Sequence, residues 1–320
     1  MKNLATRLNE RSLALCERSI ELSDLLDIRV SRQAQATVLD FGCDRTGSIA
    51  GGIMLARICL ADLANVNVTR PGSLGLPMVE VTTDHPLWAC MASQYAGWAF
   101  STGEYFAMGS GPARMSRGGE EMLEEYDLLF PSENVVGVLE SGNLPGPAEA
   151  AEFLKQCHAD AGSICVARTA SLPGSIQVVA RSVETTMHKL HELKFDLRKI
   201  KNALGSAPLP PIASKDLVAL GWTNDSILYG AETVLWVDAE DEELKEIGPR
   251  IPSNSSRDFG KPFLEIFEAY DRDFYKIDRM LFSPARVVLH GLKSGNTFIY
   301  GEIRNDILAK EFQISAKVSS

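Results

Sequence analysis

The residues best suited to chemistry gather in one segment, SIQVVARSVETTMHKLHELKFD (175–196). Its spacing predicts a single long helix with Ser175 as the N-cap. An apolar stripe, which should face a core, is formed by Ile176, Val179, Val183, Met187 and Leu190. A polar stripe lies about 120° around the same helix and is formed by Arg181, Glu184, His188 and His191. This polar stripe has the position from which a helix can border a cleft.

Arg181 and Glu184 stand three residues apart, so their side chains can touch on such a helix. Pairs of this kind are most often solvated surface ion pairs that contribute about 0–1 kcal/mol. His188 and His191 would need a third ligand to hold a metal ion, and the sequence has no HExxH motif or matching cysteine pair to supply one. We therefore expect no metal site.

Two glycine-rich and serine-rich loops could receive an anionic group of a ligand. GSGPAR (109–114) and RTGSIAGG (45–52) expose successive backbone N–H groups, and Arg114 ends the first of them. Neither loop is a dinucleotide fingerprint or a P-loop, and tight turns explain both equally well. The nearby aromatic residues could stack on a flat heterocycle, although aromatic side chains at this density more often form a core; they are Trp88, Tyr95, Trp98, Tyr105 and Phe106.

Length and composition limit the class of protein. The chain has 320 residues, 45% of them hydrophobic and 23% charged, which is typical of a globular protein with about two domains. The net charge of −10 argues against nucleic acid and anionic membranes as partners. The N-terminal 26 residues read as an amphipathic helix rather than a signal peptide, and no segment is apolar enough to span a membrane. We expect a cytoplasmic protein.

The alternation of strand, glycine turn and helix predicts a layered α/β fold. Strands are expected at 36–42, 66–70, 78–84, 135–141, 164–169, 286–290 and 297–303, and a hairpin at 227–239. The proline-rich segment GSAPLPPIA (205–213) is the best candidate for a lobe boundary. We expect a first lobe at 1–204 and a second at 205–320, with segments exchanged between the lobes allowed.

Seven motifs occur in an order that resembles one family. They are SQYAGW (93–98), FAMGSGPAR (106–114), the helix segment 175–196, LGSAPLPP (204–211), TNDSILYG (223–230), PSNSSRDFGKPF (252–263) and DFYKIDRMLFSPA (273–285). Together they resemble the methenyltetrahydromethanopterin cyclohydrolases, one-carbon enzymes of methanogens, related archaea and methylotrophic bacteria. The resemblance extends from about residue 35 to about residue 303.

The resemblance implies two α/β lobes that enclose a cleft, a homotrimer, and hydrolysis of a methenyl bridge to the 5-formyl compound without metal or redox cofactor. The family's catalytic glutamate follows an arginine by three residues, which matches Glu184 and Arg181. Water attacks an amidinium carbon in this reaction, so a carboxylate can accept its proton and return one to the leaving nitrogen. Ser182 stands between the pair, where an aliphatic residue is expected.

The same resemblance assigns further residues to the pterin site. As lining or anion-holding groups we expect Gln94, Tyr95, Ser110, Gly111 and Arg114. As polar groups at strand ends or loop starts we expect Glu140, Asn224 and Tyr229. Two alternatives stay open, a pterin-dependent one-carbon dehydrogenase and a non-catalytic pterin-binding protein. The missing GxGxxG motif argues against the first, and the Arg181–Glu184 pair argues against the second.

Overall fold

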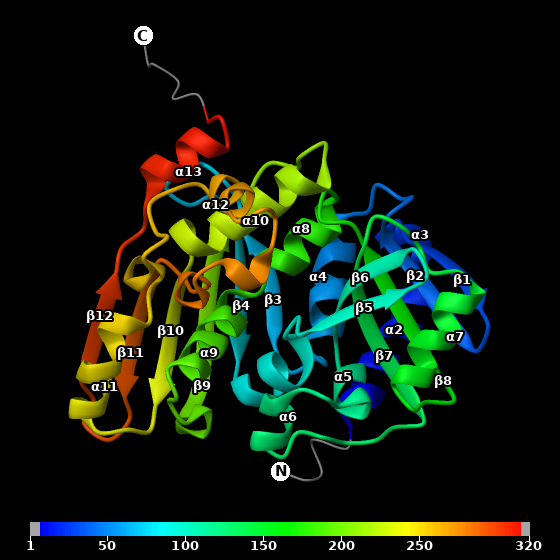
Figure 1. Cartoon of the computed structure of the whole chain (residues 1–320), viewed down its shortest axis with the longest axis horizontal. Helices are drawn as coiled ribbons and strands as arrows, with labels where there is room; N and C mark the ends of the chain where they lie inside the picture. The colour runs from blue at the N-terminus through cyan, green and yellow to red at the C-terminus, as the bar shows by residue number, and fades with distance from the viewer. Residues whose placement is uncertain (1–6, 315–320) are drawn as a thin grey trace. The chain divides into compact units, whose positions relative to one another are not determined.

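The computed structural model describes residues 7–314, which form two units with one six-stranded sheet each (Figure 1). The first unit includes the described chain up to Val66 and the segment Thr83–Val178. The second includes Asn67–Thr82 and the described chain from Val179 onward. Two sheets with covering helices confirm the predicted α/β class.

The sheet of the first unit has the strand order β1-β2-β8-β7-β6-β5. The strands β2, β8 and β7 run parallel, whereas β1, β6 and β5 pair antiparallel to their neighbours. The strands of this sheet are β1 (Arg29–Gln33), β2 (Ala36–Gly42), β5 (Trp98–Thr102), β6 (Tyr105–Ser110), β7 (Asn134–Glu140) and β8 (Ala161–Ala167). The helices are α2 (Leu8–Glu21), α3 (Ser23–Leu26), α4 (Ile49–Cys59), the π-helix η1 (Leu87–Gln94), α5 (Ala113–Arg117), α6 (Glu121–Glu125) and α7 (Pro147–Gln156).

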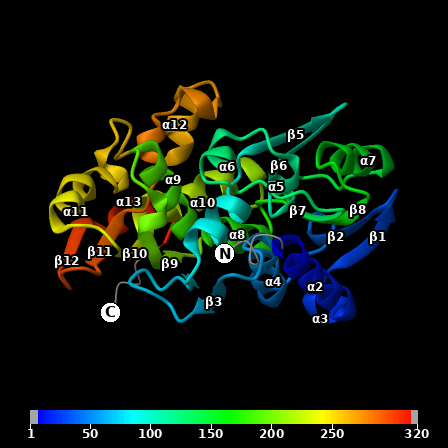
Figure 2. The same cartoon turned by 90° about the horizontal axis from the view of Figure 1, so that it is seen from below.

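Both faces of this sheet are buried, which explains the nearly continuous apolar sequence of its parallel strands. Leu39 and Cys165 pack with α2 and α4 on one face. The preceding residues in the same strands, Val38 and Ile164, pack with Phe153 of α7 on the other. Figure 2 shows α7 on one side of the sheet and the α2–α4 pair on the opposite side.

The sheet of the second unit has the order β12-β11-β10-β9-β4-β3, in which β10 and β11 are parallel. Its strands are β3 (Asn65–Thr69), β4 (Met78–Thr83), β9 (Ile200–Pro208), β10 (Glu232–Val237), β11 (Arg286–Gly291) and β12 (Thr297–Gly301). Its longer helices are α9 (Ser182–Glu192), α10 (Asp216–Gly230), α11 (Asp241–Ile247), α12 (Phe263–Ala269) and α13 (Asn305–Glu311). The short helices are η2 (Leu197–Lys199), η3 (Gly248–Arg250), η4 (Ser253–Ser255), η5 (Phe274–Lys276) and η6 (Arg279–Leu281).

The division of the chain differs from the boundary expected at 204/205. The segment Gly205–Pro208 is not a connector, because it completes the inner strand β9 and ends it with a proline. The chain instead passes between units at Val66/Asn67, Thr82/Thr83 and Val178/Val179. The hairpin expected at 227–239 is also absent, since 227–230 complete α10 and only 232–237 form a strand.

The long helix expected at 175–196 is two helices. α8 (Leu172–Val179) ends before Ala180, and α9 begins at Ser182. Ser175 is not the N-cap: Ser171 Oγ accepts the N–H of Gly174, whereas the hydroxyl of Ser175 donates to the carbonyl of Thr169. The expected apolar stripe is confirmed as buried in both helices. Within residues 7–314, no helix combines the length and hydropathy needed to cross a membrane.

Candidate functional site

The break between α8 and α9 places Arg181 and Glu184 at the start of a helix. Arg181 is the N-cap of α9 and Glu184 lies in its first turn. Their side chains are only 10% and 6% exposed, and Arg181 Nη1 lies 3.6 Å from Glu184 Oε2. The predicted contact between the two side chains is therefore confirmed, and the pair is not a solvated surface ion pair.

The position of Glu184 favours a charged carboxylate. The first turn of a helix carries the positive end of the helix dipole, which stabilises an anion there. The guanidinium of Arg181 adds a full positive charge at 3.6 Å. A buried carboxylate with these two neighbours can remain ionised and still be close to a cationic ligand, as a general base requires.

The remaining polar residues of α9 differ from each other in their surroundings. His188 lies 3.6 Å from Glu192, and burial lowers the pKa of its imidazole to about 4. Lys189, which is not among the predicted site residues, is fully buried and donates to Ser255 Oγ at 3.0 Å and to the carbonyl of Met280. Burial lowers the pKa of its ammonium group to about 8. Among the described residues, no group of three or more His, Cys, Asp or Glu side chains could hold a metal ion.

In the first unit, five of the predicted site residues lie around the C-terminal end of the π-helix η1. Gln94 is its last residue and Tyr95 its C-cap. The N–H of Gly111 donates to the carbonyl of Ser93 at 2.8 Å, and the guanidinium of Arg114 lies over the Tyr95 ring at 5.1 Å. Segments 93–98 and 106–114 are thus joined by these two contacts.

Arg114 is fully buried and its guanidinium is engaged by the protein. Nη1 donates to the carbonyl of Met91 at 3.0 Å and contacts two further carbonyls at this helix end, and Nε donates to Glu120 Oε1 at 3.0 Å. Helix C-terminal carbonyls lack intrahelical donors, so an arginine satisfies them well. The structure gives Arg114 a structural role, and contact with a ligand anion stays a prediction. Its partner Glu120 had no signal in the sequence.

Ser110, Gly111 and Glu140 are fixed by the neighbouring strands β6 and β7. Ser110 Oγ donates to the carbonyl of Val138 at 3.2 Å. Gly111 has a φ of +91°, and a Cβ there would lie 3.1 Å from the carbonyl oxygen of Val136. Both the backbone conformation and the limited space therefore favour glycine at this position. Glu140 ends β7, as expected, and its carboxylate accepts the hydroxyl of Thr169.

Asn224 and Tyr229 lie within α10, not at a strand end or the start of a loop. The side-chain amide of Asn224 donates to the carbonyl of Leu220 at 2.9 Å in its own helix. The hydroxyl of Tyr229 donates to the carbonyl of Lys261 and accepts the N–H of Gly260 at 3.1 Å. Burial raises the pKa of Tyr229 to about 12. Tyr229 therefore anchors the loop before α12.

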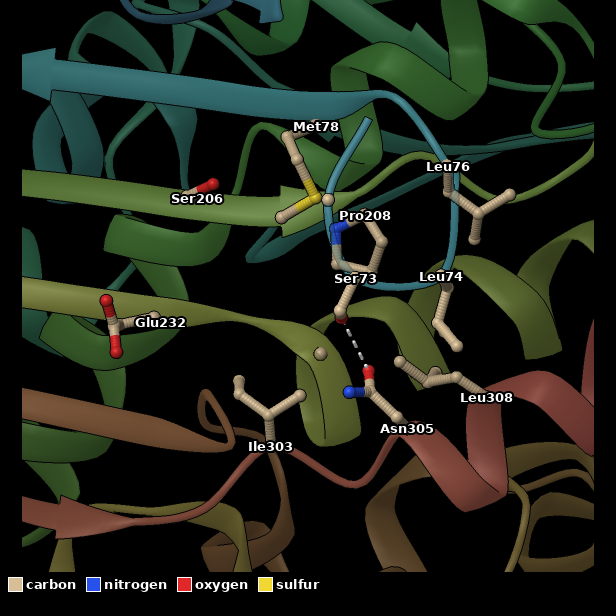
Figure 3. A pocket seen from close by; sticks show the side chains of 12 residues that line it. Ser73, Leu74, Leu76, Met78, Ser206, Pro208, Glu232, Ile303, Asn305 and Leu308 are labelled. Atoms are coloured by element: carbon tan, nitrogen blue, oxygen red, sulfur yellow. Dashed lines mark hydrogen bonds between the residues drawn. The ribbon is translucent and has the colours of Figure 1, made fainter. Parts of the chain in front are cut away.

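A cavity of about 210 Å³ opens in the second unit (Figure 3). It is lined mainly by apolar side chains, and the hydroxyl of Ser73 points to the Asn305 side chain at its rim. Glu232 also lines it and is paired with Arg286 at 3.0 Å. The ten predicted site residues are not among the described residues that line this cavity.

Comparison with known proteins identifies the family. A sequence profile of the family described as "Cyclohydrolase (MCH)" matches residues 7–312. The chain belongs to this cyclohydrolase family. The methenyltetrahydromethanopterin cyclohydrolase of Rhodopirellula baltica is 48% identical over 289 residues, covering 87% of this chain and 86% of the relative. Enzymes of the same name from Methanococcoides burtonii and Methanosarcina barkeri are 40% and 41% identical, each covering 96% of this chain and 98% of the relative.

Membership of the cyclohydrolase family confirms the resemblance inferred from the ordered motifs. The match extends further than the motifs did, since it begins at the start of α2 rather than near residue 35.

Proposed function

We propose that this chain hydrolyses the methenyl bridge of 5,10-methenyltetrahydromethanopterin, reversibly, to the 5-formyl compound. The names of relatives that match nearly the whole chain support the substrate and the reaction. The buried Arg181–Glu184 pair supports the mechanism, because it holds one carboxyl group beside a guanidinium in a fixed place. This pair is the observation on which the proposed chemistry depends.

The reaction has three chemical demands. The bridging carbon lies between two nitrogens that share one positive charge, water adds to this carbon, and one carbon–nitrogen bond then breaks. Glu184 accepts a proton from the attacking water and returns it to the leaving nitrogen, so no net proton stays on the enzyme. The remaining hydroxyl proton of the adduct leaves to solvent as the formyl carbonyl forms, which turns the cationic substrate into a neutral product. Catalysis of this kind contributes about 10²–10⁴-fold. While the substrate is cationic, the carboxylate also balances its charge.

Arg181 acts on Glu184 rather than on the substrate. Its guanidinium restrains the carboxylate and favours the charged form that accepts a proton. Gln94, Tyr95, Ser110, Gly111, Arg114, Glu140, Asn224 and Tyr229 stay predicted substrate contacts. The hydrogen bonds described above already give Arg114 and Tyr229 structural roles, so their loss should reduce stability as well as binding.

The decisive experiment is Glu184→Gln, assayed by the loss of the methenyl chromophore with no added cofactor. We expect kcat to fall by about 10²–10⁴-fold with the unfolding midpoint nearly unchanged. Glu192→Gln is the matched control, since it makes the same change at the other end of α9 and should keep kcat. Near-normal turnover by Glu184→Gln would remove this residue from the mechanism.

The same assay tests the two alternative functions. A dehydrogenase would consume the methenyl compound only with reduced nicotinamide, and a carrier would bind it without consuming it. We also propose a cytoplasmic homotrimer that needs no metal or redox cofactor. Light scattering should then give about three times the 34.9 kDa chain mass, and exhaustive chelation should leave kcat unchanged.

A further inference from the structure

The first turn of α9 is held from outside by a side chain with no role so far. The carbonyl oxygen of Ser182, directly after Arg181, lies 2.8 Å from Thr186 Oγ1 and 3.1 Å from Thr185 Oγ1, both in α9. It also lies 3.2 Å from Thr233 Oγ1, and Thr233 belongs to β10. Thr233 therefore joins the start of the helix to the sheet.

Thr186, Thr233 and the Ser182 carbonyl form a closed triangle. The two hydroxyl oxygens are 3.0 Å apart, and all three residues are fully buried. Each hydroxyl has one proton, so one donates to the carbonyl while the other donates to its neighbouring hydroxyl. Removing the Thr233 hydroxyl takes away one of the two hydroxyl protons, and only the hydrogen bond from Thr186 to the Ser182 carbonyl is left.

Opposite Thr233 on the adjacent strand stands Gly205. A Cβ at Gly205 would lie 2.2 Å from Ser182 Oγ and 2.9 Å from Val183 Cγ2. The first turn of α9 thus rests on the Thr233–Gly205 cross-strand pair, and only glycine allows this approach. The close approach also accounts for the small residue at 182, where the sequence suggested an aliphatic one.

Packing alone does not explain a hydroxyl at 233. Residues 233, 235 and 237 share one buried face of β10, and the other two are Leu235 and Val237. Valine has the shape of threonine and suits a strand equally well. The polar atom is therefore the exception on an apolar face, and the start of α9 is what it contacts.

The first turn of α9 needs a contact from outside the helix to fix its position. Its N-cap, Arg181, makes no side-chain capping hydrogen bond, and helix ends without a cap tend to fray. Fraying of this turn would move Arg181 relative to Glu184 and would move the carboxylate relative to a bound substrate. Displacements of about 1 Å at a reacting group can cost about 10²-fold in rate.

We propose that Thr233 is a positioning residue for the hydrolysis, acting through the Ser182 carbonyl on the Arg181–Glu184 pair. This inference rests on the function proposed above. Thr233 touches no reacting atom in this scheme. Its hydroxyl sets where the first turn of α9 lies on the sheet, and thereby where the carboxylate of Glu184 lies.

The test compares Thr233→Val with Thr233→Ser and with Thr223→Val. Thr223 is also fully buried, but its hydroxyl donates to Ala219 at 2.9 Å within α10. We expect Thr233→Val to lower kcat about 10–100-fold with KM within a factor of about 3. Thr233→Ser should restore most of kcat. Thr223→Val should keep kcat even where its unfolding midpoint falls as far.

Each result is decisive. Wild-type kcat in Thr233→Val, or a loss of kcat in Thr223→Val that follows its loss of stability, would overturn the proposal. If Thr233→Val cannot be purified folded, Thr233→Ala also removes the hydroxyl, and unchanged kcat there overturns it as well. Glu184→Gln separates the two proposals: normal turnover in that variant defeats the proposed mechanism, whereas an inactive Glu184→Gln beside a fully active Thr233→Val defeats only the positioning role.

Discussion

The buried carboxyl of Asp225 should make the stability of this protein depend on pH in a way that one substitution removes. Asp225 lies in α10 and is 1% exposed. Its Oδ1 accepts the N–H of Phe263, the first residue of α12, at 2.8 Å. Its Oδ2 is buried and has no hydrogen-bond partner among the described residues. Burial, together with Glu265 and Glu311 nearby, raises the pKa of Asp225 to about 8.

The raised pKa of Asp225 determines how the free energy of unfolding changes with pH. The unfolded chain releases the Asp225 proton near pH 4, whereas the folded protein keeps it until about pH 8. The contribution of the neutral Asp225 carboxyl to the free energy of unfolding is therefore fully present below about pH 4 and is lost as the pH rises to about 8. One proton of difference corresponds to at most about 1.4 kcal/mol per pH unit. Between pH 5.5 and 7.5 the loss should amount to about 2–3 kcal/mol.

Asp225→Asn keeps an oxygen that accepts the Phe263 N–H and has no charge to bury. Urea unfolding of both proteins from pH 5 to pH 8.5 should show the variant gaining stability over the wild type as the pH rises. Asp271→Asn, at an 85% exposed carboxyl, is the control and should follow the wild-type curve. Parallel curves for Asp225→Asn and the wild type would refute the reasoning.

Two further predictions concern the second unit. Burial holds the pKa of His188 at about 4, so the wild type should lose stability as the pH falls from about 6.5 towards 4. Between pH 7 and pH 4.5 the thermal unfolding midpoint of His188→Gln should therefore fall less than that of the wild type. An equal fall in both proteins would contradict this prediction. Tyr229→Phe removes the hydrogen bonds to Lys261 and Gly260 and should cost about 1–2 kcal/mol. Trypsin should then cut after Arg257 faster, and an unchanged rate would show that the loop is anchored otherwise.

Much of the fold could be predicted because the relevant signals are local. The strand at 36–42 has the predicted limits, and Ser48 caps α4 by accepting the N–H of Gly51 at 2.9 Å. The end of α10 resembles part of a hairpin in the sequence, because every residue from 225 to 230 is buried and no helical periodicity remains.

The break before Arg181 could not be predicted, since the helical spacing of apolar residues continues across it and no glycine or proline marks it. The residues that the start of α9 contacts, Gly205 and Thr233, are distant in sequence.

In the candidate site, too, local contacts could be predicted and tertiary contacts could not. Arg181 and Glu184 contact each other through spacing along one helix turn, which a sequence displays directly. The partner of Arg114 is Glu120, and the partners of Lys189 lie in the short helices η4 and η6. Such partners are set by tertiary packing, so residue types alone assigned Arg114 to a ligand and left Lys189 unnoticed.

The division of the chain also has a consequence for how it is made. The ribosome delivers β3 and β4 early, yet the inner strand that pairs with β4 is β9, which starts only at Ile200. Until then β4 presents an open edge of unpaired backbone groups, the kind of surface through which nascent chains associate wrongly. A gene fragment ending near residue 180 would carry this edge permanently. Expression of the first unit by itself therefore requires replacing Asn67–Thr82 with a short polar connection.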